Sequence, residues 1–333
     1  GRSHLVARED RIALPTQDLD QTHRPHWPER GIHVHTMHPI ELTNLLNGWG
    51  RTGHDDAKGF EAMKPEWRLY NEWLLANRQN LVEWVLLLAT DWSTFAESKT
   101  RQQRLAALVD ICHEYGIAAG VDVGIALQQQ HTFRLITQTG ELAAEKKQLR
   151  ARADYLMAAG FDFLSTEIGT SEFTSPDDKR MLAWIDELGT YLDSKYGKKV
   201  HIKVHCSQGQ TASNYKHPRT GKPLNYNFLP HYAVPQVGVL PHTVQVYALD
   251  DPAPTYGNQD FGFIRDFLRL EGGARDVLWH PETAYWVSYD VDVPLFLPVY
   301  AERRLRDLRL IADDEAKGLV GDKGRAGSRI QGQ

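Results

Sequence analysis

The segment FDFLSTE, residues 161–167, follows a long helical stretch that is closed by Gly160. Its residues show no helical period, and the run stops at a carboxylate, Glu167. A short apolar run behind a glycine-terminated helix is typical of a parallel strand that is buried on both faces. The segment therefore predicts one step of a repeating α/β sheet.

The same step recurs along the chain. Repeated strand–helix units predict a parallel sheet, and about seven of them predict a closed (β/α)8 TIM barrel. We expect an irregular N-terminal arm over residues 1–30 and the barrel over residues 31–333. The eighth strand is not clearly visible, because residues 314–333 are polar and rich in glycine. The predicted strands are 31–36, 81–89, 117–123, 161–166, 200–204, 243–249 and 277–280, and the predicted helices are 65–77, 100–115, 141–159, 177–196, 260–270 and 298–313.

The composition excludes several classes of protein. The net charge is -5 over 333 residues, which gives no reason to expect nucleic acid or an anionic membrane as a partner. The apolar runs are too short to cross a bilayer. The two cysteines, Cys112 and Cys206, are too few for a disulfide framework and are expected to be buried thiols. No phosphate-binding loop is present, and we expect no cofactor.

A second segment, VLWHPETAYW at residues 277–286, has the form of the first. It is an apolar strand that ends at a carboxylate, Glu282, among aromatic residues. In a parallel barrel the carboxyl ends of all strands meet at one mouth, so Glu167 and Glu282 should face the same cleft. Hydrolysis of a glycosidic bond requires such a pair of carboxyl groups.

This arrangement resembles the clan of retaining glycoside hydrolases on (β/α)8 barrels. The resemblance implies that Glu167, on strand 4, is the acid/base and that Glu282, on strand 7, is the nucleophile. It also implies a carbohydrate substrate and a tyrosine, here Tyr247, close to the nucleophile. The clan normally has asparagine before the acid/base, and this chain has Thr166. Glu172 is a rival for Glu167 that lies further out in the loop.

Other polar and aromatic residues are predicted near the ends of strands. The aspartates among them could accept hydrogen bonds from sugar hydroxyls or cap the following helices. Polysaccharide degradation would favour a secreted or periplasmic location. The predicted substrate-binding residues are His33, His35, Asp91, Trp92, Asp122, His205, Tyr247, Asp250, His280, Tyr285 and Trp286.

Two alternatives remain open at this point. His33 and His35 form an HxH pattern on strand 1, which resembles the start of a metal-dependent amidohydrolase with His205 as a further ligand. Against it, Glu167 stands where that family has lysine, no strand-8 aspartate is evident, and His242 is expected at the wrong end of strand 6. The second alternative is a carbohydrate-binding barrel without catalysis.

A retaining mechanism predicts the distance between the two carboxylates. The carboxylates of Glu167 and Glu282 should lie about 5–5.5 Å apart, and a spacing of about 6.5–9.5 Å would indicate inversion. At least one of Trp279, Tyr285 and Trp286 should expose an aromatic face as a platform for a sugar ring.

Overall fold

The structure is a computed structural model. It describes residues 24–34, 40–88, 94–126, 132–168, 177–245, 247–252, 258–282, 296–321 and 327–333.

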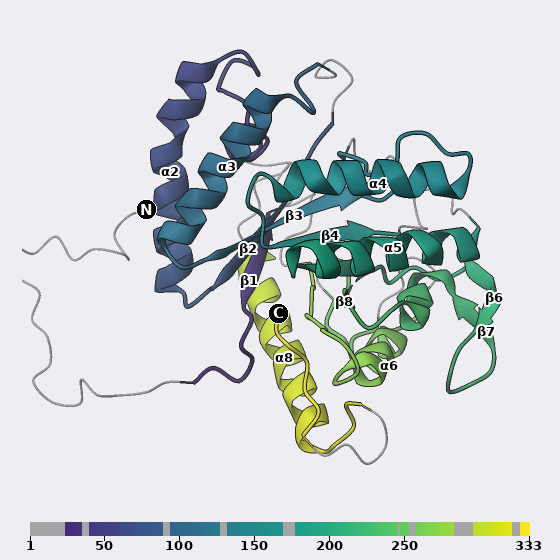
Figure 1. Cartoon of the computed structure of the whole chain (residues 1–333). Coiled ribbons are helices and arrows are strands. Elements are labelled where there is room, and N and C mark those ends of the chain that lie inside the picture. Colours follow the sequence, from purple (N-terminus) through teal and green to yellow (C-terminus); the bar gives the residue numbers. More distant parts are fainter. Residues whose placement is uncertain are drawn as a thin grey trace, which may run out of the picture.

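Six parallel strands form the main sheet, in the order β1-β2-β3-β4-β5-β8 (Figure 1). Each strand pairs with the next of these six in chain order, and α-helices connect the strands from β1 to β5, as expected for a parallel sheet. The strands are β1 (Gly31–Val34), β2 (Leu81–Val85), β3 (Ala118–Gly124), β4 (Phe163–Glu167), β5 (Lys199–Val204) and β8 (Val237–Pro241).

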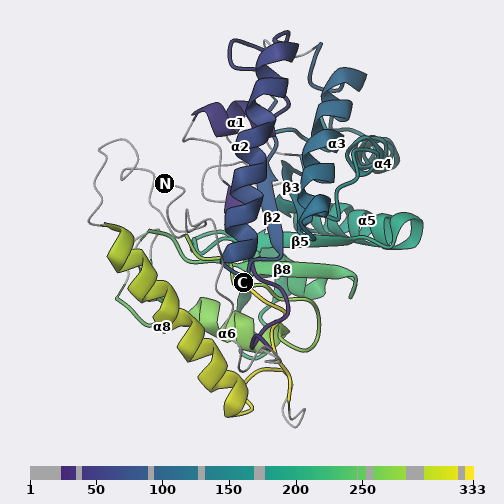
Figure 2. The same cartoon turned by 90° about the vertical axis from the view of Figure 1, so that its left-hand side faces the viewer.

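Helices cover the outer face of this sheet. Helices α3, α4 and α5 follow one another along the sheet, and α8 lies on the other side of the molecule near α6 (Figures 1 and 2). None of the described helices is long and apolar enough to span a membrane. The helices are α1 (Ile40–Leu46), α2 (Ala57–Ala76), α3 (Lys99–Glu114), α4 (Leu142–Met157), α5 (Asp178–Tyr196), α6 (Gly262–Glu271) and α8 (Phe296–Ala316).

Local sequence signals explain where several helices begin and end. The Ser98 side chain accepts a hydrogen bond from the backbone N–H of Arg101 and so caps α3. Asp177 caps α5 in the same way. Helix α5 ends at Gly197, whose φ of 61° is the left-handed conformation that favours glycine. Pro65 lies inside α2 and not at its start, because α2 begins at Ala57.

Two short segments complete the ring of eight strand positions. Residues 276–282 take the seventh position and residues 331–333 take the eighth, each through isolated bridges. The (β/α)8 barrel predicted from the sequence is therefore confirmed, with an eighth position too short to recognise from pattern. The bonds that close the ring run from the Leu278 N–H to the Val239 carbonyl (3.1 Å), from the Trp279 N–H to the Gly332 carbonyl (2.9 Å) and from the Gly31 N–H to the Gln333 carbonyl (2.9 Å).

The sixth barrel strand differs from the prediction. It is β8 (Val237–Pro241) and not residues 243–249, which follow it. The true strand was hidden because Pro235, Gly238 and Pro241 read as turn signals. The predicted loop at 207–235 also contains a hairpin of β6 (Thr211–Lys216) and β7 (Pro223–Asn225), and then a 3-10 helix, η3 (Tyr226–Tyr232).

Three glycines shape the half of the barrel interior that lies toward the amino ends of the strands. Each faces a large side chain on the paired residue of the neighbouring strand, and a Cβ atom on the glycine would overlap that side chain. The large side chains therefore lean over the glycines. The three pairs are Gly31 with Leu81, Gly120 with Phe163 and Gly238 with His201.

Gly120→Ala is expected to destabilise the barrel. The new Cβ would lie 2.1 Å from the Phe163 ring, so the ring must move within a packed interior. Such overpacking costs about 1–3 kcal/mol, measurable by urea unfolding. Gly140→Ala is the matched control, because nothing lies within 4 Å of its Cβ position. Equal stability of the two variants would contradict the packing described here.

Candidate active site in the barrel

A belt of polar side chains crosses the barrel interior. We define the polar belt as His33, Glu83, Asp122, Ser165 and Lys203, which come from five different strands. Lys203 on β5 bonds Asp122 on β3, and Ser165 on β4 bonds Glu83 on β2. One strand lies between the members of each pair in the sheet, so these contacts cross the interior.

The ion pair between Asp122 and Lys203 is the strongest contact in the polar belt. Lys203 Nζ lies 2.5 Å from Asp122 Oδ2, and the two side chains are only 9% and 7% exposed. Burial alone would raise the pKa of Asp122, but the Lys203 ammonium and His33 outweigh it and hold that pKa at about 2. The neighbouring carboxylates raise the pKa of Lys203 in spite of its burial. Both groups are therefore charged at neutral pH.

Glu83 behaves in the opposite way. Burial, together with the negative charge of Asp122, raises the pKa of Glu83 to about 8. Lys203 and the Ser165 hydroxyl, which donates to Glu83 Oε1 at 2.6 Å, oppose this shift without cancelling it. At pH 7 Glu83 is therefore mainly a neutral acid, and the belt contains one carboxylate and one ammonium.

His33 joins the two acids. Its Nε2 atom lies 3.3 Å from Asp122 Oδ2 and 3.6 Å from Glu83 Oε1. These three residues could share a cation, since one ligand atom from each lies within 4.8 Å of the others. Lys203 already supplies a positive charge beside Asp122, which opposes a divalent metal there. This is also not the predicted set, because it contains Glu83 and Asp122 in place of His35 and His205.

The two predicted catalytic carboxylates lie above the belt, at the carboxyl ends of their strands. Glu167 ends β4 and is 8% exposed. Glu282 is half-buried, and its N–H bonds the Thr243 carbonyl beyond β8 (3.2 Å). Burial raises the pKa of Glu282, and the charge of Glu167 adds to the shift. The two carboxylates are thus within electrostatic reach of each other.

Two residues that the sequence did not single out hold Glu282 in place. The backbone N–H of Gln245 donates to Glu282 Oε2, and Gln245 has a φ of 58°, which is unusual for a residue with a side chain. Arg304 on α8 donates to the Glu282 carbonyl (3.0 Å) and to the Tyr247 carbonyl (2.6 Å). Backbone strain at such a position is a common mark of functional sites.

Histidines line the same end of the barrel. The rings of His205 and His242 lie 4.9 Å apart, and the His280 ring lies 6.2 Å from His242 and 5.0 Å from His33. Burial lowers the pKa of His205 and of His242, so both are neutral at pH 7. The expectation that His242 lies at the wrong end of its strand is wrong, because β8 ends at Pro241 and His242 follows it.

The remaining predicted residues have mixed outcomes. Asp250 forms an ion pair with Arg306 on α8, at 2.9 Å. The Tyr247 ring packs edge-on against Phe261. Trp279 is 1% exposed in the core, so the predicted aromatic platform depends on residues that the structure does not describe. The predicted residues outside the described part of the chain are His35, Asp91, Trp92, Glu172, Tyr285 and Trp286.

Comparisons with known proteins give no match by sequence and partial similarities by structure. No protein-family model matches the chain, and no curated protein sequence matches it. A mutant O-GlcNAc hydrolase of Thermobaculum terrenum is similar in structure over 56% of this chain, at 10% identity and a TM-score of 0.38. CpGH84B is similar over 76% of this chain, at 10% identity and a TM-score of 0.44. The chain spans only 39% of the length of each. The barrel assignment rests on the strand pairing described above.

Glu83→Gln is expected to change how stability depends on pH. The folded chain keeps the Glu83 proton up to about pH 8, whereas the unfolded chain loses it near pH 4.5. The folded state therefore binds more protons in this window, and wild-type stability falls as pH rises. The melting temperature of the variant, relative to that of the wild type, should therefore be higher at pH 8 than at pH 5. A difference that stays constant with pH, as for the exposed control Glu66→Gln, would refute the neutral acid.

Lys203→Met is expected to destabilise the protein strongly, because Asp122 would keep a buried charge without its ammonium partner. Breaking a buried pair in this way costs about 3–5 kcal/mol. Adding Asp122→Asn should recover part of the loss, as urea unfolding at pH 7 can show. The control is Lys195→Met, which breaks a solvent-exposed pair with Asp154 and should cost much less. Similar losses in Lys203→Met and Lys195→Met would contradict this account.

Proposed function

We propose that the chain is a glycoside hydrolase that cleaves O-glycosidic bonds of an oligo- or polysaccharide with Glu167 and Glu282. The observation that carries the proposal is the placement of these two carboxylates. They stand at the carboxyl ends of the fourth and seventh barrel positions, within electrostatic reach of each other, above a polar interior. Active sites of (β/α)8 barrels are built at this end.

The surroundings of Glu282 support its role as the nucleophile. A nucleophile must be ionised, and the Gln245 N–H, the Arg304 guanidinium and the Lys203 ammonium all favour its charged form. Burial opposes them and leaves the pKa of Glu282 raised. The free nucleophile therefore needs a pH above that raised pKa. The Gln245 N–H also orients the carboxylate without any side chain that could itself react.

The proposed reaction proceeds by two displacements at the anomeric carbon. Glu282 attacks this carbon and forms a glycosyl ester, while Glu167 donates its proton to the departing oxygen. Water then attacks the same carbon and releases the Glu282 carboxylate, while Glu167 takes a proton from the water. The configuration at the anomeric carbon is retained, and both carboxyl groups return to their starting states.

One observation favours a second candidate, a metal-dependent hydrolase. His33, Glu83 and Asp122 place three ligand atoms close together at the base of the mouth. This candidate requires a dication to compete with the Lys203 ammonium beside Asp122. We rank it below the glycosidase for that reason, and a chelator separates the two.

Variants of the two glutamates test the proposal on activated aryl glycosides. Glu282→Ala should reduce turnover to background, because no glycosyl ester can form. Glu167→Ala should retain part of its rate with a good leaving group, and azide should restore more of it, because general acid catalysis contributes about 10²–10⁴-fold. Product analysis by NMR should show glycosyl azide with a retained anomeric configuration.

Controls decide how the result is interpreted. Glu66→Ala, an exposed change on α2, should match the wild type. Equal losses in both glutamate variants without an azide effect would reject the assigned roles. Activity that disappears with a chelator and returns with zinc would favour the metal-dependent candidate. Binding of oligosaccharides without turnover by the wild type would indicate a carbohydrate-binding barrel.

A further inference from the structure

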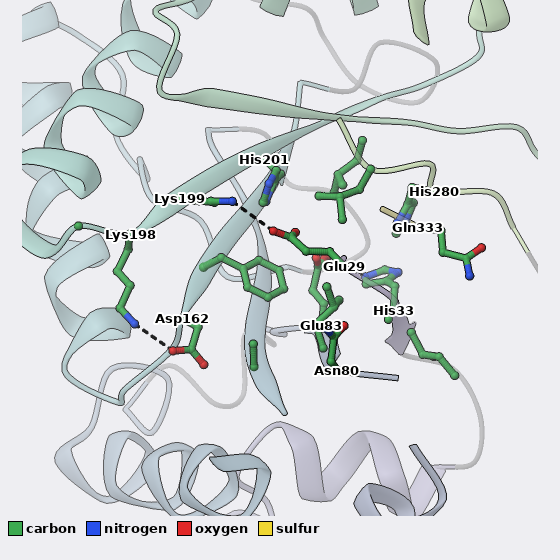
Figure 3. Close-up of a pocket in the computed structure, with 18 residues that line it drawn as sticks. Glu29, His33, Asn80, Glu83, Asp162, Lys198, Lys199, His201, His280 and Gln333 are labelled. Carbon is green, nitrogen blue, oxygen red and sulfur yellow. Dashed lines mark hydrogen bonds and ion pairs between the residues drawn. The ribbon is translucent and has the colours of Figure 1, made fainter. Parts of the chain in front are cut away.

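A cavity opens at the end of the barrel opposite to the proposed active site. Its volume is about 380 Å³, and its wall includes Leu81, Phe163, His201, Leu240 and Leu278 (Figure 3). Its rim lies at the amino ends of the strands, where Asn80 and Lys198 immediately precede β2 and β5. Active sites of (β/α)8 barrels use the other face. This cavity opens at the amino ends of the strands and reaches inward as far as His33, Glu83 and His280 (Figure 3).

The large members of the three glycine pairs, Leu81, Phe163 and His201, line the wall of this cavity. The interior of such a barrel is normally filled by layers of side chains. Here Gly31, Gly120 and Gly238 supply none, and the three large partners lean over them.

His201 is the unusual residue in this wall. It is 2% exposed, and within the described part of the chain neither ring nitrogen has a hydrogen-bond partner. Burial lowers its pKa to about 4, so at neutral pH the ring presents one N–H donor and one bare nitrogen acceptor. Leaving buried polar atoms unpaired is costly, and each such case requires an explanation.

The charged groups at the rim are not available to bind an ionic ligand, because they already form ion pairs with one another. Lys198 lies 2.9 Å from Asp162, and Lys199 lies 2.5 Å from Asp276 and 3.2 Å from Glu29. Figure 3 shows the first pair and the contact between Lys199 and Glu29 at the cavity. An ionic ligand would find no free countercharge among these residues. Apolar side chains form much of the inner wall, and His33, Glu83 and His280 line it beside His201.

We propose that this cavity binds a small, uncharged and mainly apolar molecule that carries one hydroxyl group, such as a phenol or a cyclic alcohol. The apolar part contacts Leu81, Phe163, Leu240 and Leu278, and the hydroxyl group pairs with His201. A volume of about 380 Å³ is ample for a single six-membered ring. The site is separate from Glu167 and Glu282 and does not depend on the proposed hydrolysis.

Phenol and toluene test the proposal, because they have similar size and differ in the hydroxyl group. Calorimetric titration of the full chain should show phenol binding about 2–10-fold tighter than toluene, the size of one net hydrogen bond. His201→Phe should remove this preference while toluene still binds. This variant should fold, since it replaces an unpaired polar ring with an apolar one. With ¹⁵N-labelled histidine, phenol should shift the ring nitrogens of His201 in the wild type.

A second variant and a control complete the test. Ala118→Leu extends a side chain from the cavity wall and should weaken both probes without altering His201. His217→Phe, in the β6–β7 hairpin, should bind both probes as the wild type does. Equal affinity for phenol and toluene in the wild type, or no binding of either probe, would overturn the proposal. An unchanged phenol preference in His201→Phe would also overturn it.

Discussion

The buried ion pair between Asp122 and Lys203 is the constraint on which the barrel mouth depends. Two charges taken out of water are stable only when each satisfies the other, and here they lie 2.5 Å apart across the interior. The remaining belt residues follow from this pair. Glu83 is buried and lies near the charge of Asp122, so it keeps its proton, while His33 bridges the two acids. Lys203 also acts on Glu167 and Glu282, so one ammonium influences four carboxyl groups of the barrel interior and mouth.

Main-chain contacts position the two proposed catalytic glutamates. Glu167 is the Cα partner of Lys203 in the sheet, so its place is set by the same register that sets the ion pair. Glu282 has no such strand beneath it. Its segment pairs through single bridges, and its position instead relies on the Thr243 carbonyl, the Gln245 N–H and Arg304. The left-handed backbone of Gln245 is the conformational cost of aiming that N–H at the carboxylate.

Much of the barrel was predictable because buried parallel strands leave a direct signal. The strands ending at Val85, Gly124, Glu167 and Val204 were all recognised as apolar runs between helices. The sixth was missed because Gly238 and its flanking prolines imitate a turn. Its glycine is tolerated because the His201 ring covers it, a tertiary contact that no local pattern contains. The expectation that functional residues lie at the carboxyl ends of strands selected Glu167 and Glu282 as candidates, but it passed over Glu83 and Lys203. Their signal was present as charged residues within strands that are otherwise apolar.

The two halves of the barrel interior are filled in different ways. Eight strands enclose an interior that side chains must fill or that a ligand must occupy. In the half toward the carboxyl ends of the strands, the residues of the polar belt fill the interior and form hydrogen bonds with one another across the barrel axis. In the half toward the amino ends of the strands, three glycines supply no side chain. The His201 ring, which has no hydrogen-bond partner in the described part of the chain, remains beside the space. An apolar residue at position 201 would remove that cost without any loss of packing area. The imidazole is therefore better explained by a binding partner for its ring nitrogens than by the stability of the barrel.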